Sequence, residues 1–599
     1  MLALGCVSVE QDVLVLPPSP SAFASIRVEP ASAALTLING RPAFQQFRAF
    51  GVREDGTEIA LASVDRWELL DDRLGFADES GVVTAEGPTG GVTRVNARLG
   101  PDDEGEVLQA SAALTIRVEY AFSFEVDAAT VEAVLAAADG DGSLAPEVLH
   151  PLAGAEVPED LPALDVHWTT DGGEAVYEVR LQSELADVRW IVNEPDVTSL
   201  LLDGAEKMAL LETGRGQSIR VSVARFDGSA LHRSAPVDIR VVEGALLSDL
   251  IYFDDTGRLL SVGWVDGRRT ALLPSPPARD ADRCVGCHAI ARGGDAFSAA
   301  LYGEPREGIV FDFDGDISRD PADGEPVPGS DFGFSALSTD GNLLIASIDG
   351  RLRAFDAFEM DTLDLGLPTE LATQPALGDE GELYYIAADA TERFEGSTLR
   401  VAGFEDGAYR SPETLFNGSE LSAQPEGGAT VAHPTLGPDP QWLVFAHGPQ
   451  SWLGPEERLT ESALYLSVDG RSPVRLTRLL PGGMSSATWP SFAPRSVGEG
   501  SNARYWLVFL SRAPFGGADG TLGTDLRQLW LASLDPNAPA GSDPSHPPVR
   551  VPLQSSDTHN LGAAFRALDC IEPNERCVAG PQCCSGRCAP DEDEDYACD

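Results

Sequence analysis

Positive charge is scarce in this chain of 599 residues, which holds 42 lysines and arginines against 95 aspartates and glutamates, a formal net charge of −53. Clustered cations bind the phosphates of nucleic acids, so this balance excludes a nucleic-acid partner. An anionic membrane surface would repel the chain as well. No run of residues approaches the ~20 apolar residues of a transmembrane helix, so we expect membrane attachment only through a lipid anchor.

Aromatic residues are also few, at 7%, whereas the chain holds 60 glycines and 43 prolines and is 43% hydrophobic. Glycine and proline at this level indicate many turns between short strands, which predicts an all-β protein. At ~100–200 residues per domain, the length predicts three to five domains.

The nine cysteines fall into three groups. Six lie near the C-terminus, two form one C-x-x-C, and one stands alone: Cys570, Cys577, Cys583, Cys584, Cys588 and Cys598; Cys284 and Cys287; and Cys6. Residues 569–599 are too few to bury a core, which predicts a disulfide-rich module in an oxidising compartment, with its pairing open. The adjacent pair Cys583-Cys584 and the spacing resemble cystine-knot and Dickkopf-like mini-modules. A zinc module is the alternative, disfavoured because the segment is very acidic and has no histidine.

Residues 1–22 are interpreted as a signal remnant and tether. Cys6 follows Leu-Ala-Leu-Gly, which resembles the end of a lipoprotein signal peptide and implies acylation after export. The expected location is the outer membrane, cell surface or periplasm of a Gram-negative bacterium. Ala3 stands where that pattern has leucine, and no basic region precedes it, so a short N-terminus with a chance cysteine is the alternative. The proline-rich residues 16–20 predict an extended tether.

Two β-sandwiches are predicted before the middle of the chain, over residues 23–119 and 147–244, where short apolar segments alternate with turn signals. The first resembles a bacterial Ig-like group 2 domain in Phe50-Gly51 and Trp67 and in the order of the segments around them. The resemblance implies a spacer or adhesion module. The other sandwich resembles a fibronectin type III or related Ig-like domain.

The linker between the sandwiches, residues 120–146, contains an alanine-rich helical turn and the sequence Asp139-Gly140-Asp141-Gly142. These carboxylates could ligate Ca²⁺, but the full twelve-residue loop of a calcium site is lacking, so a solvated turn is the better interpretation.

Residues 245–568 repeat a unit of one turn followed by one apolar strand. The unit recurs with strands at residues 343–348, 383–387, 442–446 and 505–510. This resembles the Tol-type β-propeller, which implies six or seven blades. We expect residues 251–253 to close the ring from the N-terminal side. The whole chain is thus predicted to hold two β-sandwiches, a propeller and a small disulfide-rich tail.

The sequence Cys284-Val285-Gly286-Cys287-His288 is a C-x-x-C-H motif, the attachment sequence of c-type haem. Two thiols at this spacing can add to the vinyl groups of one porphyrin, and the adjoining histidine can coordinate the iron. The motif therefore predicts one covalent haem c, held by Cys284, Cys287 and His288. A disulfide with an incidental histidine, a thioredoxin-like redox pair and a zinc half-site are the alternatives.

His433 is the first candidate for the sixth iron ligand. His288 and His433 each lie 15 residues before a glycine, with one apolar strand between, so the two segments superpose without a gap. That places both histidines on equivalent loops at one end of the propeller axis. Met484 and His559 are the further candidates, and an open sixth position would bind small ligands or peroxide.

These features predict an exported, lipid-anchored, mono-haem c-type cytochrome-like protein for electron transfer or redox sensing, with an unidentified redox or surface protein as partner. The first alternative is a surface adhesion or protein-binding scaffold without haem, in which Cys284 and Cys287 form a disulfide. The other alternative is a haem peroxidase-like oxidoreductase. No catalytic residue is predicted.

Overall fold

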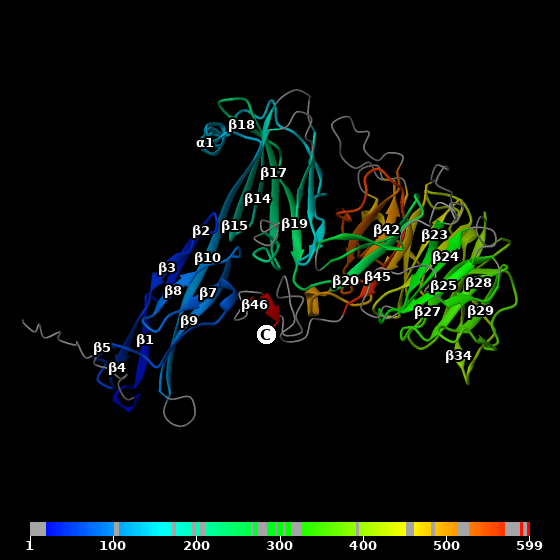
Figure 1. Cartoon of the computed structure of the whole chain (residues 1–599), viewed down its shortest axis with the longest axis horizontal. Coiled ribbons are helices and arrows are strands. Elements are labelled where there is room, and N and C mark those ends of the chain that lie inside the picture. Colours follow the sequence, from blue (N-terminus) through cyan, green and yellow to red (C-terminus); the bar gives the residue numbers. More distant parts are fainter. Residues whose placement is uncertain are drawn as a thin grey trace, which may run out of the picture. The chain divides into compact units, whose positions relative to one another are not determined.

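Figure 1 shows the computed structural model of the chain, which describes residues 20–100, 107–169, 175–193, 199–203, 210–264, 267–273, 284–294, 296–302, 307–312, 325–329, 331–390, 394–450, 461–480, 486–512, 526–568, 588–590 and 596–598. Cys6, residues 16–19 of the tether, Met484 and the first four cysteines of the C-terminal segment lie outside these residues. The chain divides into two compact units. The first is Met1–Phe122 with Leu181–Arg189 and Met208–Thr213, and the second is Ser123–Arg180, Trp190–Lys207 and Gly214–Asp599.

Strands dominate the described residues, in which the helix with stated bounds is α1 (Ala128–Ala136), and this confirms the all-β prediction. Short 3₁₀ helices occur at Pro20–Ala22, Asp72–Leu74, Gly418–Leu421, Thr477–Leu479 and Gly500–Asn502. Within the described residues, no helix is long and apolar enough to cross a membrane.

The first unit contains two three-stranded sheets, β1-β4-β5 and β3-β8-β7, and the strands β6, β9, β10 and β2, which pair in that order. The long strand β10 buries alternate residues, including Leu114, Ile116 and Val118, as expected of a strand with one face in a core. The bounds are β1 (Ser25–Glu29), β2 (Ser32–Ile38), β3 (Ala43–Gln46), β4 (Arg48–Val52), β5 (Glu58–Ala60), β6 (Arg66–Leu69), β7 (Gly75–Ala77), β8 (Val82–Ala85), β9 (Gly91–Leu99) and β10 (Leu108–Phe124).

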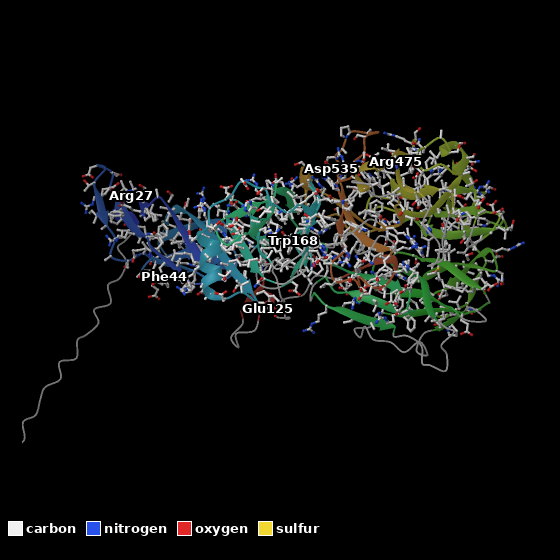
Figure 2. The ribbon with its side chains drawn as sticks, turned by 90° about the horizontal axis from the view of Figure 1, so that it is seen from above. Arg27, Phe44, Glu125, Trp168, Arg475 and Asp535 are labelled. Carbon is white, nitrogen blue, oxygen red and sulfur yellow. The ribbon has the colours of Figure 1, made fainter. Side chains whose placement is uncertain are left out.

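The second unit opens with α1, which begins after Asp127 because that carboxylate accepts hydrogen bonds from the backbone N–H groups of Ala129 and Thr130. Sheets β11-β13-β16 and β12-β19-β17-β14 follow. Trp168 of β13, labelled in Figure 2, is fully buried, and its ring packs on that of Tyr177 with centroids 5.6 Å apart. The bounds are β11 (Val148–His150), β12 (Glu156–Pro158), β13 (Leu164–Trp168), β14 (Val176–Gln182), β15 (Ala186–Val192), β16 (Ser199–Leu202), β17 (Ser218–Phe226), β18 (Leu231–Arg233) and β19 (Val237–Val242).

A β-propeller makes up the rest of the second unit, as the repeats predicted. The described residues form six four-stranded blades: β45-β20-β21-β22, β23 to β26, β27 to β30, β31-β32-β33-β36, β37 to β40, and β41 to β44, here blades 1 to 6. The ring is closed in blade 1, where β45 from the end of the propeller pairs antiparallel with β20 from its beginning. Residues 251–253 lie in β20 and so take part in this closure.

The bounds of the propeller strands are β20 (Ser248–Asp254), β21 (Leu259–Val262), β22 (Arg269–Leu273), β23 (Cys284–Ile290), β24 (Ala296–Tyr302), β25 (Glu307–Asp312), β26 (Glu325–Val327), β27 (Phe332–Leu337), β28 (Leu343–Ile348), β29 (Arg351–Asp356), β30 (Thr362–Leu363), β31 (Ala372–Leu377), β32 (Leu383–Ala388), β33 (Ser397–Ala402), β34 (Phe404–Glu405), β35 (Ala408–Tyr409), β36 (Glu413–Asn417), β37 (Thr430–Leu436), β38 (Trp442–Gly448), β39 (Ala463–Val468), β40 (Val474–Arg475), β41 (Thr488–Phe492), β42 (Tyr505–Ser511), β43 (Gln528–Leu534), β44 (Val549–Arg550) and β45 (Asn560–Ala567).

Each inner strand of the propeller carries an irregularity of register at the same place. In five blades a residue there has positive φ: Cys287 (24°), Gln374 (51°), His433 (52°), Trp489 (51°) and Gly562 (42°). In three blades proline follows this residue directly. The bulge turns the next side chains of each inner strand toward the axis.

The predicted superposition of His288 on His433 is wrong by one residue. Gly286 pairs with Ala300 in blade 2 as Ala432 pairs with Ala446 in blade 5, so the equivalent of His433 is Cys287. Both lie in inner strands, not in loops. The two glycines used to align the segments are not equivalent, because Gly448 is the last residue of strand β38, whereas strand β24 already ends at Tyr302.

The C-terminal segment is described only at β46 (Cys588–Pro590) and β47 (Tyr596–Cys598), which pair antiparallel. Their register sets the backbone of Cys588 directly opposite that of Cys598.

Candidate functional site

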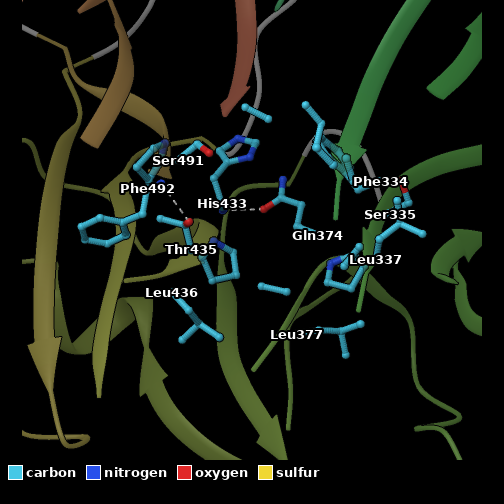
Figure 3. Close-up of a pocket in the computed structure, with 18 of the residues that line it drawn as sticks. Phe334, Ser335, Leu337, Gln374, Leu377, His433, Thr435, Leu436, Ser491 and Phe492 are labelled. Carbon is cyan, nitrogen blue, oxygen red and sulfur yellow. Dashed lines mark hydrogen bonds between the residues drawn. The ribbon is translucent and has the colours of Figure 1, made fainter. Parts of the chain in front are cut away.

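A cavity of about 190 Å³ lies on the axis of the propeller, lined by residues of all six inner strands (Figure 3). Far less space, ~10–15 Å³, already holds a single water molecule. The cavity is smaller than the ~300–1,000 Å³ of clefts that hold drug-sized ligands. It therefore has room for a small molecule.

Short side chains form one ring around the cavity, with one residue from each blade at the position that follows the bulge. The ring members are Ala289, Ser335, Ala376, Thr435, Ser491 and Ala564. Because six strands converge here, only short side chains leave space at the axis. Three of the six carry a hydroxyl group, and these come from blades 3, 5 and 6.

The three hydroxyl groups differ in how far the protein already uses them. Ser335 Oγ lies 2.9 Å from Ser298 Oγ. Thr435 Oγ1 accepts a hydrogen bond of 3.4 Å from the backbone N–H of Phe492, which leaves its own proton to donate. The Ser491 hydroxyl makes no hydrogen bond to any described residue. At least two hydroxyl protons can therefore reach a ligand.

Aromatic rings surround one level of the cavity, next to the bulges. The rings of His433 and Trp489 stack, with centroids 4.9 Å apart and planes 13° from parallel. Phe334 meets both, at 5.6 Å from His433 and 5.8 Å from Trp489. Phe253 of β20 packs against Trp489 and His288. Figure 3 shows Gln374 between Phe334 and His433, where its Oε1 accepts from the backbone N–H of His433 (2.7 Å).

Arg292, just beyond the end of β23, also lines the cavity and joins three blades. Its Nη1 donates to Asp379 Oδ1 at 3.1 Å, and its Nη2 donates to the backbone carbonyls of Leu436 and Gly437. Asp379 follows the inner strand of blade 4, and Leu436 ends that of blade 5. The guanidinium thus reaches across the end of the channel, with its charge balanced by one carboxylate.

His288 lines the axial cavity. Its Nε2 lies 3.1 Å from the backbone carbonyl oxygen of Ile251, and in the tautomer protonated at Nε2 it donates a hydrogen bond to that oxygen. Burial lowers the pKa of His288 to about 4, because the imidazolium would lose its hydration, while the bond to Ile251 acts in the opposite direction. The ring is therefore neutral at pH 7 with Nε2 occupied.

Cys287 lies in a different environment from His288. Its side chain is 6% exposed and belongs to an apolar cluster with Ala291, Ala300 and Phe332, whereas His288 lines the axial cavity. Both residues lie in strand β23, whose pairing with β24 is shifted between Gly286 and His288. Thioether attachment needs both thiols and the imidazole nitrogen at one porphyrin. The Cys287 side chain and the His288 ring face different surroundings in this conformation, and the haem motif stays a prediction.

The sixth-ligand candidates are separated by the fold. His433 lines the same cavity as His288. His559 lies outside this lining, and its Nδ1 accepts a hydrogen bond from the backbone N–H of Arg527 at 3.1 Å. Met484 is outside the described residues.

The carboxylates considered for calcium contact cationic or imidazole side chains. Asp139 lies 3.2 Å from Arg233 Nε, and Asp141 lies 3.2 Å from His232 Nδ1. Among the described residues, no group of three or more His, Cys, Asp or Glu side chains could hold a metal ion. These contacts favour the interpretation as a turn.

Sequence reasoning missed Arg292, Trp489 and the hydroxyl ring. One signal could have pointed to the ring: Gln374-Pro375, His433-Pro434 and Trp489-Pro490 share an X-Pro pair followed by a small residue and an apolar one. No sequence signal connects Arg292 to partners 87 and 144 residues away.

No family model matches the chain, and no curated protein matches it. Among solved structures it is similar to a chain of a nidogen/laminin complex, with a TM-score of 0.33 and 11% identity over 54% of this chain and 100% of that chain. It is also similar to a putative 6-phosphogluconolactonase from Bacteroides uniformis, with a TM-score of 0.31 and 14% identity over 58% of this chain and 94% of that chain. For the dihydro-heme d1 dehydrogenase NirN in complex with DHE, the TM-score is 0.27 and the identity 11%, over 49% of this chain and 52% of that chain. Likeness at this level carries no functional assignment.

Proposed function

We propose that this protein is an exported binding protein whose propeller takes a small ligand in its axial channel. One observation carries the proposal: all six inner strands contribute to one cavity of about 190 Å³ that combines hydroxyl groups with aromatic rings. Concave sites with a small number of placed polar groups are typical of small-molecule binding. The strands that precede the propeller would act as spacers or adhesion modules, as in the predicted surface scaffold.

Filling the channel tests this proposal. Ala376 belongs to the ring of short side chains, so Ala376→Leu places a larger side chain on the axis. Ala133→Leu is the matched control, because Ala133 is an exposed residue of helix α1. We expect ligands found by thermal shift in a mixture of small soluble fragments to stabilise the wild type and the control, but not Ala376→Leu. Fragments that stabilise all three proteins equally, or none of them, would refute a channel site.

The second candidate is the mono-haem c-type cytochrome-like protein for electron transfer or redox sensing. It is favoured by the C-x-x-C-H motif and by the fact that His288 and His433 line one cavity. In this candidate Cys284 and Cys287 would hold the porphyrin and His288 the iron. A bound haem would supply one-electron chemistry, and a peroxidase-like activity would further require an open iron position.

A haem stain of a denaturing gel and a pyridine haemochrome spectrum test this candidate. The protein is exported in a host with c-type maturation machinery, beside Cys287→Ala and Ser422→Ala, the latter an exposed-loop control. Covalent haem in wild type and control, lost in Cys287→Ala, would establish the cytochrome. Absence of haem from all three proteins would reject the cytochrome and leave the binding protein as the proposed function.

Export and lipid anchoring through Cys6 belong to the same proposal. We expect labelled fatty acid to be incorporated into the exported wild type and not into Cys6→Ser, with the label recovered in the membrane fraction. Equal labelling of the two proteins would reject Cys6 as the acylated residue.

A further inference from the structure

We infer that the axial channel binds a small, uncharged, polyhydroxylated ligand of monosaccharide size. This inference rests on the proposed function of the channel and adds the chemical class of the ligand. Three features carry it: the balance of charge at the cavity, the arrangement of hydrogen-bonding groups, and the aromatic level.

Charge at the cavity favours an uncharged ligand. Arg292 is the one Asp, Glu, Lys or Arg side chain among the described lining residues. Asp379 already balances its charge at 3.1 Å, so an anion placed beside the guanidinium would also face this carboxylate. A cation would be repelled by Arg292, and the described lining residues include no carboxylate that would attract it. A neutral molecule avoids both costs.

Hydrogen-bonding groups occur around the circumference of the channel and at its end. Ser491 offers an unused hydroxyl, and Thr435 offers a proton. The Nε–H of Arg292 has no partner among the described residues, because the hydrogen bonds of this side chain use Nη1 and Nη2. Hydroxyl groups both donate and accept, so they suit a ligand that carries several hydroxyl groups of its own. A ligand with one polar group would leave most of these sites without a partner.

The aromatic level adds apolar faces beside these polar groups. Trp489 and Phe334 both line the cavity, with ring centroids 5.8 Å apart and planes tilted by 55°. A pyranose ring has apolar C–H faces and a rim of hydroxyl groups, so one face can pack on an aromatic ring while the rim reaches Ser491 and Thr435. Purely aromatic or aliphatic ligands would use the rings and bury the hydroxyl groups unpaired, which costs free energy.

The experiment is isothermal titration calorimetry of the full chain with defined probes. Glucose, galactose, mannose, xylose and N-acetylglucosamine are the neutral sugars, glucuronate is the anionic match, and cyclohexanol and indole are the apolar matches. We expect at least one neutral sugar to bind saturably. We expect Ser491→Ala and Thr435→Val each to weaken that sugar about tenfold, a loss typical of one to two hydrogen bonds to a ligand. Ser422→Ala is the control and should bind like the wild type.

The outcomes separate this inference from the proposed function. Tighter binding of glucuronate than of every neutral sugar, or binding of cyclohexanol or indole alone, in each case abolished by Ala376→Leu, overturns the ligand class and leaves the channel site. A sugar that binds equally to Ser491→Ala, Thr435→Val and wild type overturns the inference too. If no probe binds and no fragment depends on Ala376, both proposals fail. Thermal unfolding of each variant shows whether it is folded.

Discussion

Glu156 of strand β12 and Arg504, just before strand β42, form a buried two-pronged ion pair, with Nε–Oε2 at 2.7 Å and Nη2–Oε1 at 3.1 Å. The residues are 2% and 4% exposed. Ser533 of β43 donates a further hydrogen bond of 2.7 Å to the same carboxylate. This cluster fastens the segment before the propeller to blade 6, across 348 residues of sequence.

Glu156→Gln should strongly destabilise the second unit. Removing one partner of a buried pair leaves the other charge uncompensated, which typically costs about 3–5 kcal/mol. Asp349→Asn is the control, because its pair with Arg353 at 3.1 Å is exposed, with side chains 45% and 44% accessible. Such exposed pairs contribute ~0–1 kcal/mol. Urea unfolding measures both, and equal losses would show that burial does not decide the effect.

The pair also predicts a dependence on acid. Burial raises the pKa of Glu156, but hydrogen bonds from Arg504 and Ser533 outweigh it, so its pKa lies below the usual 4.5. A carboxyl with a lowered folded pKa stabilises the protein above its unfolded pKa and loses that contribution as the pH falls. The stability difference between wild type and Glu156→Gln should therefore shrink below about pH 4.5. A constant difference from pH 7 to pH 3 would contradict this.

Asp160 predicts the opposite pH dependence. Burial raises its pKa from 3.8 to about 7, even though the backbone N–H groups of Leu246 and Leu247 donate to the carboxylate. The folded state then holds the proton that the unfolded state releases, so stability is full below pH 3.8 and is lost as the pH rises to about 7. Asp160→Asn keeps an acceptor oxygen but cannot ionise.

Between pH 4 and pH 7 the Asn variant should gain stability relative to wild type, by up to about 1.4 kcal/mol per pH unit. Urea unfolding at several pH values measures this gain. A difference that stays flat over this range would place the folded pKa near its ordinary value.

Closure of the ring predicts which C-terminal truncations the propeller tolerates. Strand β45 is the inner strand of blade 1 and buries Leu561, Ala563 and Phe565. A chain ending at Leu568 keeps this strand, and we expect it to melt within a few degrees of the full chain. A chain ending at Thr558 loses it, which leaves blade 1 with three strands and should abolish the cooperative melting transition. Equal melting of the two truncated chains would show that β45 does not close the ring.

The sequence was sufficient for the second strand of these blades and insufficient for the axis. The apolar runs at 343–348 and 383–387 coincide with strands β28 and β32 because each run follows a turn and contains no exposed residue. At the inner strands a bulge adds a residue whose presence no apolar pattern reveals. His288 was placed one residue out of step with blade 5 because the glycines used for the alignment are not equivalent: Gly448 ends β38, whereas β24 ends at Tyr302.

The contents of the channel depend on contacts between blades. Trp489 meets Phe253, Phe334 and His433, and these four residues come from four different strands far apart in the sequence. Arg292 reaches two other blades. Local spacing can show a C-x-x-C-H motif, but not that its thiol and its imidazole lie in different environments.

A final prediction compares the same interaction at two depths. Glu426 Oε1 accepts hydrogen bonds from Tyr465 Oη (2.5 Å) and His447 Nδ1 (2.9 Å), and the glutamate side chain is 1% exposed. In the preceding blade Glu370 accepts from Tyr385 Oη at 2.5 Å and pairs with Arg400, but its side chain is 37% exposed.

Glu426→Gln should therefore cost about 1–3 kcal/mol of unfolding free energy, because it leaves buried hydrogen-bonding groups with a weaker partner. Glu370→Gln should cost clearly less, since water can replace the lost interaction. Burial raises the pKa of Glu426, but bonds from His447 and Tyr465 outweigh it and lower the pKa to about 2. The cost of Glu426→Gln should thus be full above pH 4.5 and diminish as the pH falls toward about 2. Urea unfolding between pH 7 and pH 3 measures both variants, and a larger loss for Glu370→Gln would reverse the assigned role of burial.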